Sequence, residues 1–476
     1  MSLNKKISLK IALPWLRRFL AYGFLALLLL AFLNPRPLSE VVAFLARFQF
    51  GQALAHLASG GDPKTIALVT VMALLTCFLG RWFCGFVCPL GALMDLVSRL
   101  KGLFGRRRFR YKPFTFKSVL IPLLTLIAFW FGASTFFGLL EPYSLLVSKS
   151  LVYAGPNLLL FGVIILAFWR GRSFCDFLCP TGLVLKILAL ASPFHLSVKA
   201  NCLKCGACSR VCAAFCVDGQ TQTLDRGRCL LCFDCLAVCP NGSLSWGRVS
   251  APRALPVQSR RSFLSQAAFG VLAFGSWLAP ETLRAKTLGQ PDAAPILPPG
   301  ALSLAHFGAH CSLCHGCVRL CPNQALVPSS VTHPALWDRP VLDPYQGFCQ
   351  YDCVLCAQIC PTGALRPLSV EEKHRTRLGQ VTFERAECVI VKNGTSCGAC
   401  AELCPTGAVR MTMTPLDREE PFIRDNLCVG CGACQQACPV RPISAIRVTG
   451  LLIHQTADLP VVIETEDETL TEDFPF

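Results

Sequence analysis

The chain reads CLKCGACSRVC at residues 202–212 and CLLCFDCLAVCP at residues 229–240. Both stretches have the spacing C-x2-C-x2-C-x3-C, in which three closely spaced thiolates bind one iron–sulfur cubane and the fourth cysteine binds its neighbour. We therefore expect two [4Fe–4S] clusters, one on Cys202, Cys205, Cys208 and Cys239, the other on Cys229, Cys232, Cys235 and Cys212. Zinc is the alternative, but zinc ribbons separate two C-x2-C pairs by about 15–20 residues. Cys216 is left over and is expected to be structural.

Four more cysteine groups follow in the last third of the chain, and each ends in Cys-Pro. Two keep the regular spacing, one opens with a gap of three residues, and one has a longer first gap. These sixteen thiolates divide into four cubanes, which gives about six clusters in the whole chain. Whether a fourth cysteine is exchanged between neighbouring groups or between the first and the last stays open. The expected ligands are Cys311, Cys314, Cys317, Cys321, Cys349, Cys353, Cys356, Cys360, Cys388, Cys397, Cys400, Cys404, Cys428, Cys431, Cys434 and Cys438.

The segment from Cys311 to His315 also fits C-x-x-C-H, the attachment signal of c-type haem. Haem attachment would consume two of the cluster ligands and leave Cys317 and Cys321 without a role. The cluster interpretation is therefore favoured, and His315 is expected to be a surface residue near a cluster.

Composition points to a membrane protein that carries metal centres. The chain has 476 residues, of which 30 are Cys, 53% are hydrophobic and only 16% are charged. These values exclude a disordered chain and argue against an entirely soluble protein or a disulfide scaffold. The net charge of +16 could favour nucleic acid. However, the basic residues cluster beside apolar segments, and thiolate-bound clusters add negative charge. We therefore expect no nucleic-acid binding.

Apolar stretches predict an α-helical membrane domain with about five transmembrane helices, because a span needs about 20 residues. The predicted spans are 15–33, 64–83, 118–140, 152–170 and 263–279. Basic flanks at the N-terminus, at 99–117 and after the fourth span indicate cytoplasmic ends. The α+β bacterial-type ferredoxin domains then lie on opposite sides of the membrane. The expected domains are a membrane domain 1–195, a cytoplasmic two-cluster ferredoxin 196–250, a fifth span with its linker 251–300, a periplasmic four-cluster ferredoxin 301–455 and an acidic tail 456–476.

An internal repeat adds a second kind of cysteine motif. The stretch GRWFCGFVCPLG at residues 80–91 reappears as GRSFCDFLCPTG at residues 171–182. The C-x3-C spacing puts both thiols of a copy on one helical face. The four thiols could bind a further metal centre, act as redox-active dithiols or simply pack in the core, and all three possibilities stay open. They belong to Cys84, Cys88, Cys175 and Cys179.

Two further features concern export and chemistry at the outer membrane face. Residues 259–264, SRRSFL, resemble a twin-arginine export signal, although an ordinary arginine pair beside a span is the alternative. Few polar groups are expected near the outer face, and ionisable groups at that depth are functional candidates. His56 and Glu141 are the candidate proton acceptors for a quinol, with solvated loop residues as the alternative.

Residues 1–250 resemble the NapH-type membrane ferredoxin family, and residues 259–450 resemble NapG, an exported four-cluster ferredoxin. The resemblance implies a multi-pass quinol dehydrogenase of the bacterial inner membrane in anaerobic respiration. It would pass electrons from the membrane quinone pool to a periplasmic cytochrome or reductase, as for periplasmic nitrate reductase. On this resemblance, two chains that are usually separate would be fused here, and Cys212 lacks the Pro that usually follows. The alternatives are a transmembrane conduit from cytoplasmic donors, or a maturation factor that keeps a partner's metal centre reduced.

Overall fold

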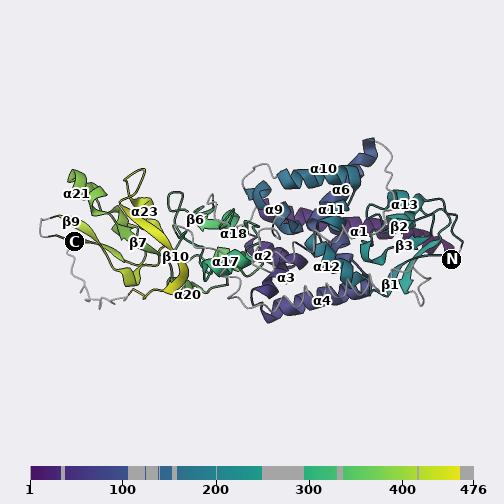
Figure 1. Ribbon diagram of the computed structural model, residues 1–476, viewed down its shortest axis with the longest axis horizontal. Coiled ribbons are helices and arrows are strands. Elements are labelled where there is room, and N and C mark those ends of the chain that lie inside the picture. Colours follow the sequence, from purple (N-terminus) through teal and green to yellow (C-terminus); the bar gives the residue numbers. More distant parts are fainter. Residues whose placement is uncertain are drawn as a thin grey trace, which may run out of the picture.

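The computed structural model describes residues 2–33, 38–104, 140–152, 158–199, 201–248, 294–329, 336–414 and 418–460, together with residues 124 and 138. The predicted fifth span, the twin-arginine motif, nearly all of the predicted third span and most of the acidic tail lie outside these residues. The described molecule is elongated (Figure 1), with three parts in a row. A helical part lies in the middle, a first ferredoxin (194–248) lies at one end, and a second ferredoxin (294–460) lies at the other.

The helical part is built around one continuous buried apolar cluster that also reaches into the first ferredoxin. Local signals set the helix limits. Asp62 caps α4 by accepting a hydrogen bond from Thr65 N at 2.7 Å, and α4 ends at Gly80, whose φ of 88° suits only glycine. The helices are α1 (Ser2–Leu33), α2 (Ser39–Arg47), α3 (Phe50–Ala58), α4 (Pro63–Leu79), α5 (Trp82–Phe86), α6 (Pro89–Phe104), α9 (Pro142–Val152), α10 (Leu158–Arg170), α11 (Ser173–Phe177) and α12 (Pro180–Ala189).

Within the described residues, one helical segment is long and apolar enough to cross a membrane, and it is Ala12–Leu33. The predicted spans 64–83 and 152–170 correspond to shorter apolar helices, α4 with 17 residues and α10 with 13. The prediction of five transmembrane helices is therefore not confirmed. Helices α1, α4 and α10 nevertheless leave large apolar side chains exposed, among them Phe19 at 76%, Phe78 at 56% and Trp169 at 66%. Such faces mark contact with lipid or protein.

The two copies of the repeat have the same order of elements. In the first copy α4 is followed by the short helix α5 and then by α6, which begins at Pro89 directly after Cys88. In the second copy α10 is followed by α11 and then by α12, which begins at Pro180 directly after Cys179. Both copies therefore place their C-x3-C motif at a short helix between two longer helices, and all four cysteines of the two motifs are buried.

The first ferredoxin has the expected α+β fold. Strand β1 (Phe194–Val198) pairs with β4 (Leu244–Arg248) in an antiparallel ladder, and β2 (Val217–Asp218) pairs with β3 (Thr223–Leu224). Two short helices, α13 (Ala207–Val211) and α14 (Asp234–Val238), each start within a cysteine motif.

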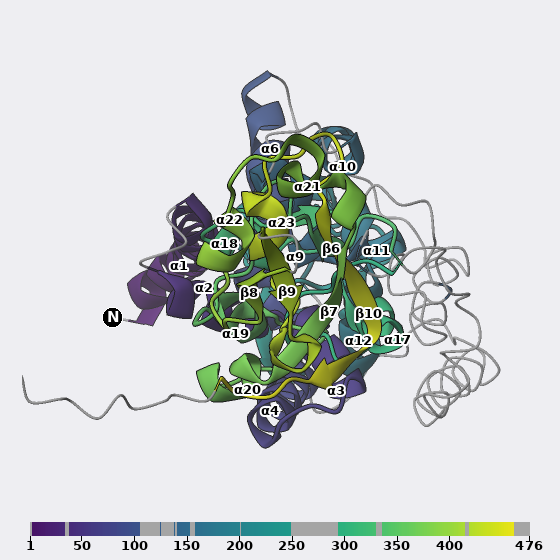
Figure 2. The ribbon, with the colours of Figure 1, turned by 90° about the vertical axis from the view of Figure 1, so that its left-hand side faces the viewer.

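The second ferredoxin consists of two halves with separate buried apolar clusters. The longest strands, β7 and β10, pair and lie side by side in Figure 2. The half next to the helical part contains α17 (Leu304–His310), α18 (Gly316–Leu320), β5 (Leu326–Pro328), β6 (Pro340–Leu342), α19 (Leu355–Ile359) and α20 (Val370–His374). The other half contains β7 (Thr376–Phe383), α21 (Val389–Asn393), α22 (Ala399–Glu402), β8 (Val409–Met413), β9 (Glu419–Ile423), α23 (Ala433–Ala437) and β10 (Ile446–Thr456).

Candidate iron–sulfur sites

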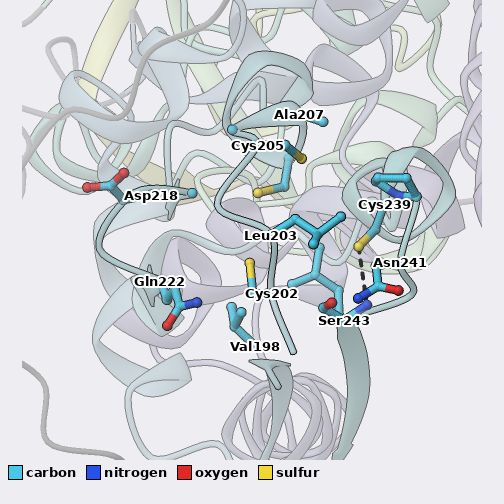
Figure 3. A pocket seen from close by; sticks show the side chains of 15 residues that line it. Val198, Cys202, Leu203, Cys205, Ala207, Asp218, Gln222, Cys239, Asn241 and Ser243 are labelled. Atoms are coloured by element: carbon cyan, nitrogen blue, oxygen red, sulfur yellow. Dashed lines mark hydrogen bonds between the residues drawn. The ribbon is translucent and has the colours of Figure 1, made fainter. Parts of the chain in front are cut away.

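In the first ferredoxin the structure gathers the cysteines in the two expected sets. Cys202, Cys205, Cys208 and Cys239 line one pocket, and Figure 3 shows the sulfur atoms of Cys202 and Cys239 beside it. The backbone N–H of Ser243 donates to Cys239 Sγ at 3.3 Å. The second set is equally compact, because Cys235 lies within electrostatic range of Cys212, Cys229 and Cys232. We name these groups the Cys202 set and the Cys229 set.

Cys216, which the sequence analysis expects to be structural, lies against the Cys229 set. Its Sγ lies 3.4 Å from Cys212 Sγ, and both residues are buried. A hydrogen bond from the Cys216 thiol lowers the pKa of Cys212 to about 7, which favours the thiolate form that metal ligation needs. The sequence signal was the C-x3-C spacing of these two cysteines.

The proximal half of the second ferredoxin settles a pairing that the spacing leaves open. Cys311, Cys314 and Cys317 share a pocket with Cys360, the last cysteine of the following group. Conversely, Cys349 and Cys356 lie close enough to Cys321 and Cys353 for their thiolate charges to interact. The last cysteine of each group therefore lies beside the first three cysteines of the neighbouring group. We name these groups the Cys311 set (with Cys360) and the Cys349 set (with Cys321).

The outer half shows the same arrangement. Cys434 lies close to Cys428, Cys431 and Cys404, and Cys400 lies close to Cys388, Cys397 and Cys438. These groups are the Cys428 set and the Cys388 set. The two halves touch at their cysteines, because Cys349 N donates to Cys431 O at 2.9 Å. The order outward from the helical part is therefore the Cys311, Cys349, Cys428 and Cys388 sets.

The cysteine sets suit cubanes better than single metal ions. Among the described residues no three His, Cys, Asp or Glu side chains lie close enough to hold one ion, whereas a cubane spreads its thiolates around four iron atoms. Backbone N–H groups donate to several sulfur atoms, as they do to cluster ligands. Leu365 N donates to Cys360 Sγ at 3.3 Å and Val409 N to Cys404 Sγ at 3.5 Å.

His315 is not a surface residue, as the sequence had suggested. It is only 1% exposed, and its Nε2 lies 2.8 Å from the carbonyl oxygen of Asp338. It lines the pocket of the Cys311 set. His315 is therefore buried beside the Cys311 set, and the prediction of a surface position is wrong.

Glu141, a candidate proton acceptor, is buried where the helical part meets the Cys311 set. It is 2% exposed and accepts hydrogen bonds from Gln52 Nε2 at 2.7 Å and Ser144 N at 2.8 Å. Gln52 Oε1 in turn accepts from the hydroxyl of Ser312, next to Cys311, at 3.0 Å. Burial raises the pKa of Glu141 to about 7, although these hydrogen bonds oppose the shift. The alternative of a solvated loop residue is wrong for Glu141.

His56, the other candidate, lies on the same face of the helical part. Its Nδ1 is 2.8 Å from Thr65 Oγ1, and burial lowers its pKa. Three residues on, Ser59 donates to Thr362 O in the second ferredoxin at 2.8 Å. Both candidates therefore lie beside the interface with the second ferredoxin.

The four thiols of the repeat also come together. Cys84, Cys88, Cys175 and Cys179 are between 4% and 8% exposed. Cys179 lies within electrostatic range of the other three. None of the 30 cysteines forms a disulfide in the structure.

These cysteine sets in α+β surroundings define the chain as an iron–sulfur protein of the ferredoxin type. Comparison with known proteins agrees. A "4Fe-4S binding domain" family matches residues 62–111 and 152–199, and a "4Fe-4S dicluster domain" family matches residues 395–441. No solved structure matches significantly.

Several characterised and uncharacterised proteins are similar to parts of the chain. The ferredoxin-type protein MauM of methylamine utilization from Methylobacillus flagellatus is 31% identical over 34% of this chain and 70% of its own length. The uncharacterized protein MJ0749 of Methanocaldococcus jannaschii is 30% identical over 44% of this chain and 77% of its own length. The ferredoxin-type protein NapH of Escherichia coli is 26% identical over 39% of this chain and 69% of its own length. The chain belongs to the family of ferredoxin-type iron–sulfur electron-transport proteins.

Proposed function

We propose that this protein is a membrane-bound quinol dehydrogenase that passes electrons outward through the second ferredoxin to a soluble periplasmic acceptor. One observation carries the proposal. Burial raises the pKa of the Glu141 carboxyl group to about 7, and Gln52 connects this group by hydrogen bonds to Ser312, beside the Cys311 set. A proton acceptor and the first electron acceptor therefore meet at one place.

The geometry matches what quinol oxidation requires. A quinol loses two protons and two electrons, while each bound cubane accepts one electron at a time. A general base works best when its pKa lies near the operating pH, and Glu141 has such a pKa of about 7. Glu141 takes one proton, and His56 on the same face is the candidate for the second. Tyr143 lines the pocket of the Cys311 set and shapes its boundary with the helical part.

The arrangement of the parts supports a membrane location. The two ferredoxins lie at opposite ends of the helical part, which contains α1, α4 and α10 (Figure 1). These three helices carry exposed large apolar side chains. Together with the basic flanks, this supports a multi-pass protein of the bacterial inner membrane. The first ferredoxin would be cytoplasmic and the second periplasmic. The partners would be the membrane quinone pool and a periplasmic cytochrome or reductase, and about six [4Fe–4S] clusters would serve as carriers.

A transmembrane conduit from cytoplasmic donors is the second candidate, and the position of the first ferredoxin favours it. Leu230, next to Cys229, lies close to Gly85, next to Cys84, because a Cβ on Gly85 would lie 2.3 Å from Leu230 O. Arg172 N also donates to Ala213 O at 3.2 Å, beside Cys212. The Cys229 set therefore adjoins the cysteines of the repeat.

The test uses the full-length protein, purified anaerobically and followed by EPR while a water-soluble quinol analogue is added. We expect the quinol to reduce the clusters of the second ferredoxin. Glu141→Gln should slow this reduction by about 10²–10⁴-fold, while dithionite still reduces the same clusters. Glu40→Gln is the matched control, because Glu40 is exposed in the first turn of α2. Clusters that dithionite reduces but quinol does not would exclude the proposal.

A further inference from the structure

The two copies of the repeat enclose one site. An arginine of each copy donates a hydrogen bond to a backbone carbonyl oxygen of the other copy. Arg172 of the second copy donates from Nη1 to Cys84 O at 2.6 Å. Arg81 of the first copy reaches Cys175 O at 3.4 Å and Cys84 Sγ at 3.7 Å. The four thiols thus face a common interior formed by both copies rather than belonging to two separate pairs.

The hydrogen bonds at this site resemble those at the ferredoxin cysteines. Gly91 N donates to Cys88 Sγ at 3.4 Å, and Gly182 N donates to Cys179 Sγ at 3.2 Å. Both glycines lie close to the arginine of the opposite copy. A Cβ on Gly91 would lie 3.2 Å from Arg172 Nη1, and a Cβ on Gly182 would lie 3.2 Å from Arg81 Nη2. Each of these backbone N–H donors contributes in favour of a thiolate at the sulfur atom that it contacts, as a metal ligand requires.

The buried arginine and aspartate side chains around the four cysteines favour a negatively charged group at this site. Four fully buried arginines pack here against only two buried aspartates, Asp95 and Asp176. Lys186 lies nearby, but Asp225 is close enough to offset it. Arg17 and Arg172 share Asp95, and Arg81 and Arg228 share Asp176. A [4Fe–4S] core with four thiolates carries roughly −2, the sign that such surroundings favour. The arginines are Arg17, Arg81, Arg172 and Arg228.

Part of this buried positive charge also lacks a hydrogen-bond acceptor. Arg17 Nη2, Arg81 Nε and Arg172 Nη2 are buried, and they have no partner among the described residues. Unsatisfied buried donors are costly. If the four thiols were neutral packing residues, these three donors would have no acceptor in the part of the chain that the structure describes.

We infer that Cys84, Cys88, Cys175 and Cys179 together bind one additional [4Fe–4S] cluster inside the helical part, where it adjoins the first ferredoxin. Each segment matched by the 4Fe-4S binding family contributes one C-x3-C pair, which is half of the ligands that a cubane needs. The fold supplies the other half by joining the two copies. Binding replaces four thiol protons by iron, so four protons leave the site.

The position of this site gives it a role between the two ferredoxins. On one side, Gly85 adjoins Leu230 of the Cys229 set. On the other, Thr181, two residues after Cys179, is near Glu141, because a Cβ on Gly51 would lie 2.5 Å from Thr181 Oγ1 and 2.7 Å from Glu141 Oε1. A bound cubane gains or loses one electron at a time. The donor would be a reduced cluster of the Cys229 set, and the acceptor an oxidised cluster of the Cys311 set.

The test counts iron and acid-labile sulfide in the full-length protein. We expect about 28 iron atoms per chain in the wild type, for seven cubanes, and about 24 in Cys84→Ser and in Cys179→Ser. Cys77→Ser is the matched control, since Cys77 lies within α4 outside the repeat motif, and it should keep the wild-type count. EPR spin quantitation after stepwise reduction should show the loss of one signal in the two test variants only.

A variant that keeps all four cysteines distinguishes the loss of one cluster from misfolding of the protein. Arg81→Gln should retain the full iron count and lower the reduction potential of one cluster, because a positive charge beside an anionic centre is removed. A wild-type count of about 24, or equal counts in wild type and both serine variants, would overturn the inference. So would unchanged potentials in Arg81→Gln. None of these measurements involves quinol, so a failure of quinol oxidation would leave the inference intact.

Discussion

The pH dependence of quinol oxidation is the sharpest test of the role of Glu141. Burial raises the pKa of this carboxyl group to about 7 from an ordinary value of 4.5. A base with that pKa is about one-tenth deprotonated at pH 6 and about nine-tenths at pH 8. The rate of quinol-driven cluster reduction should therefore rise about tenfold between these values. A carboxylate with an ordinary pKa would already be ionised at pH 6, and its rate would stay flat.

The assay is anaerobic stopped-flow absorption of the iron–sulfur bands after mixing with excess quinol analogue, from pH 5.5 to 8.5. Glu141→Gln should be slower by about 10²–10⁴-fold and should lose the rise with pH, whereas Glu40→Gln should keep both rate and profile. A flat profile in the wild type would refute the reasoning, as would a profile in Glu141→Gln that still rises tenfold.

The same pKa has a consequence for stability, with a defined sign. Because the pKa of Glu141 is higher in the folded than in the unfolded state, the folded state binds more protons between about pH 4.5 and 7. The stabilisation is complete below pH 4.5 and is lost as the pH rises through 7. The thermal midpoint of the wild type should therefore fall across this range relative to that of Glu141→Gln. Parallel midpoints in the two proteins would contradict a raised pKa.

Three further substitutions test the architecture. Asp95→Asn should destabilise the helical part by about 3–5 kcal/mol, because it leaves the buried Arg172, paired at 2.8 Å, without its anion; denaturant titration in detergent measures this. Gly85→Ala should cost about 1–3 kcal/mol and loosen the first ferredoxin, because the new Cβ would overlap the backbone of Leu230; limited proteolysis should cleave the variant faster than the wild type. Cys360→Ser should alter the EPR signal of the Cys311 set and spare that of the Cys349 set, and the reverse result would contradict the neighbour exchange.

The quinol and conduit interpretations meet at one group of residues. Glu141 is near Thr181 on the side of the repeat cysteines and is connected through Gln52 to Ser312 on the side of the Cys311 set. Electrons from quinol and electrons from the first ferredoxin would therefore enter the second ferredoxin at the same end. Whether the central thiols hold a cluster decides whether the second route exists.

The amino-acid sequence alone determined the features that depend on local spacing. The ferredoxin character follows from the C-x2-C-x2-C-x3-C runs, since a cubane needs three thiolates within a few residues. The α+β fold of the first ferredoxin, the sets of Cys202 and Cys229, and the repeated C-x3-C-P motif were readable for the same reason. The number of membrane spans stays a prediction, because hydropathy reports apolar length and not where a helix ends.

Only the tertiary structure decided the features that join distant segments. The pairing of Cys360 with the Cys311 set, the contact of Cys216 with Cys212, and the burial of His315 all depend on how separate segments pack. The same holds for Glu141, whose pKa is set by burial against residues far away in the chain. A single sequence specifies which groups are available, whereas charge burial and thiol proximity arise only when the two repeats and the two ferredoxins come together.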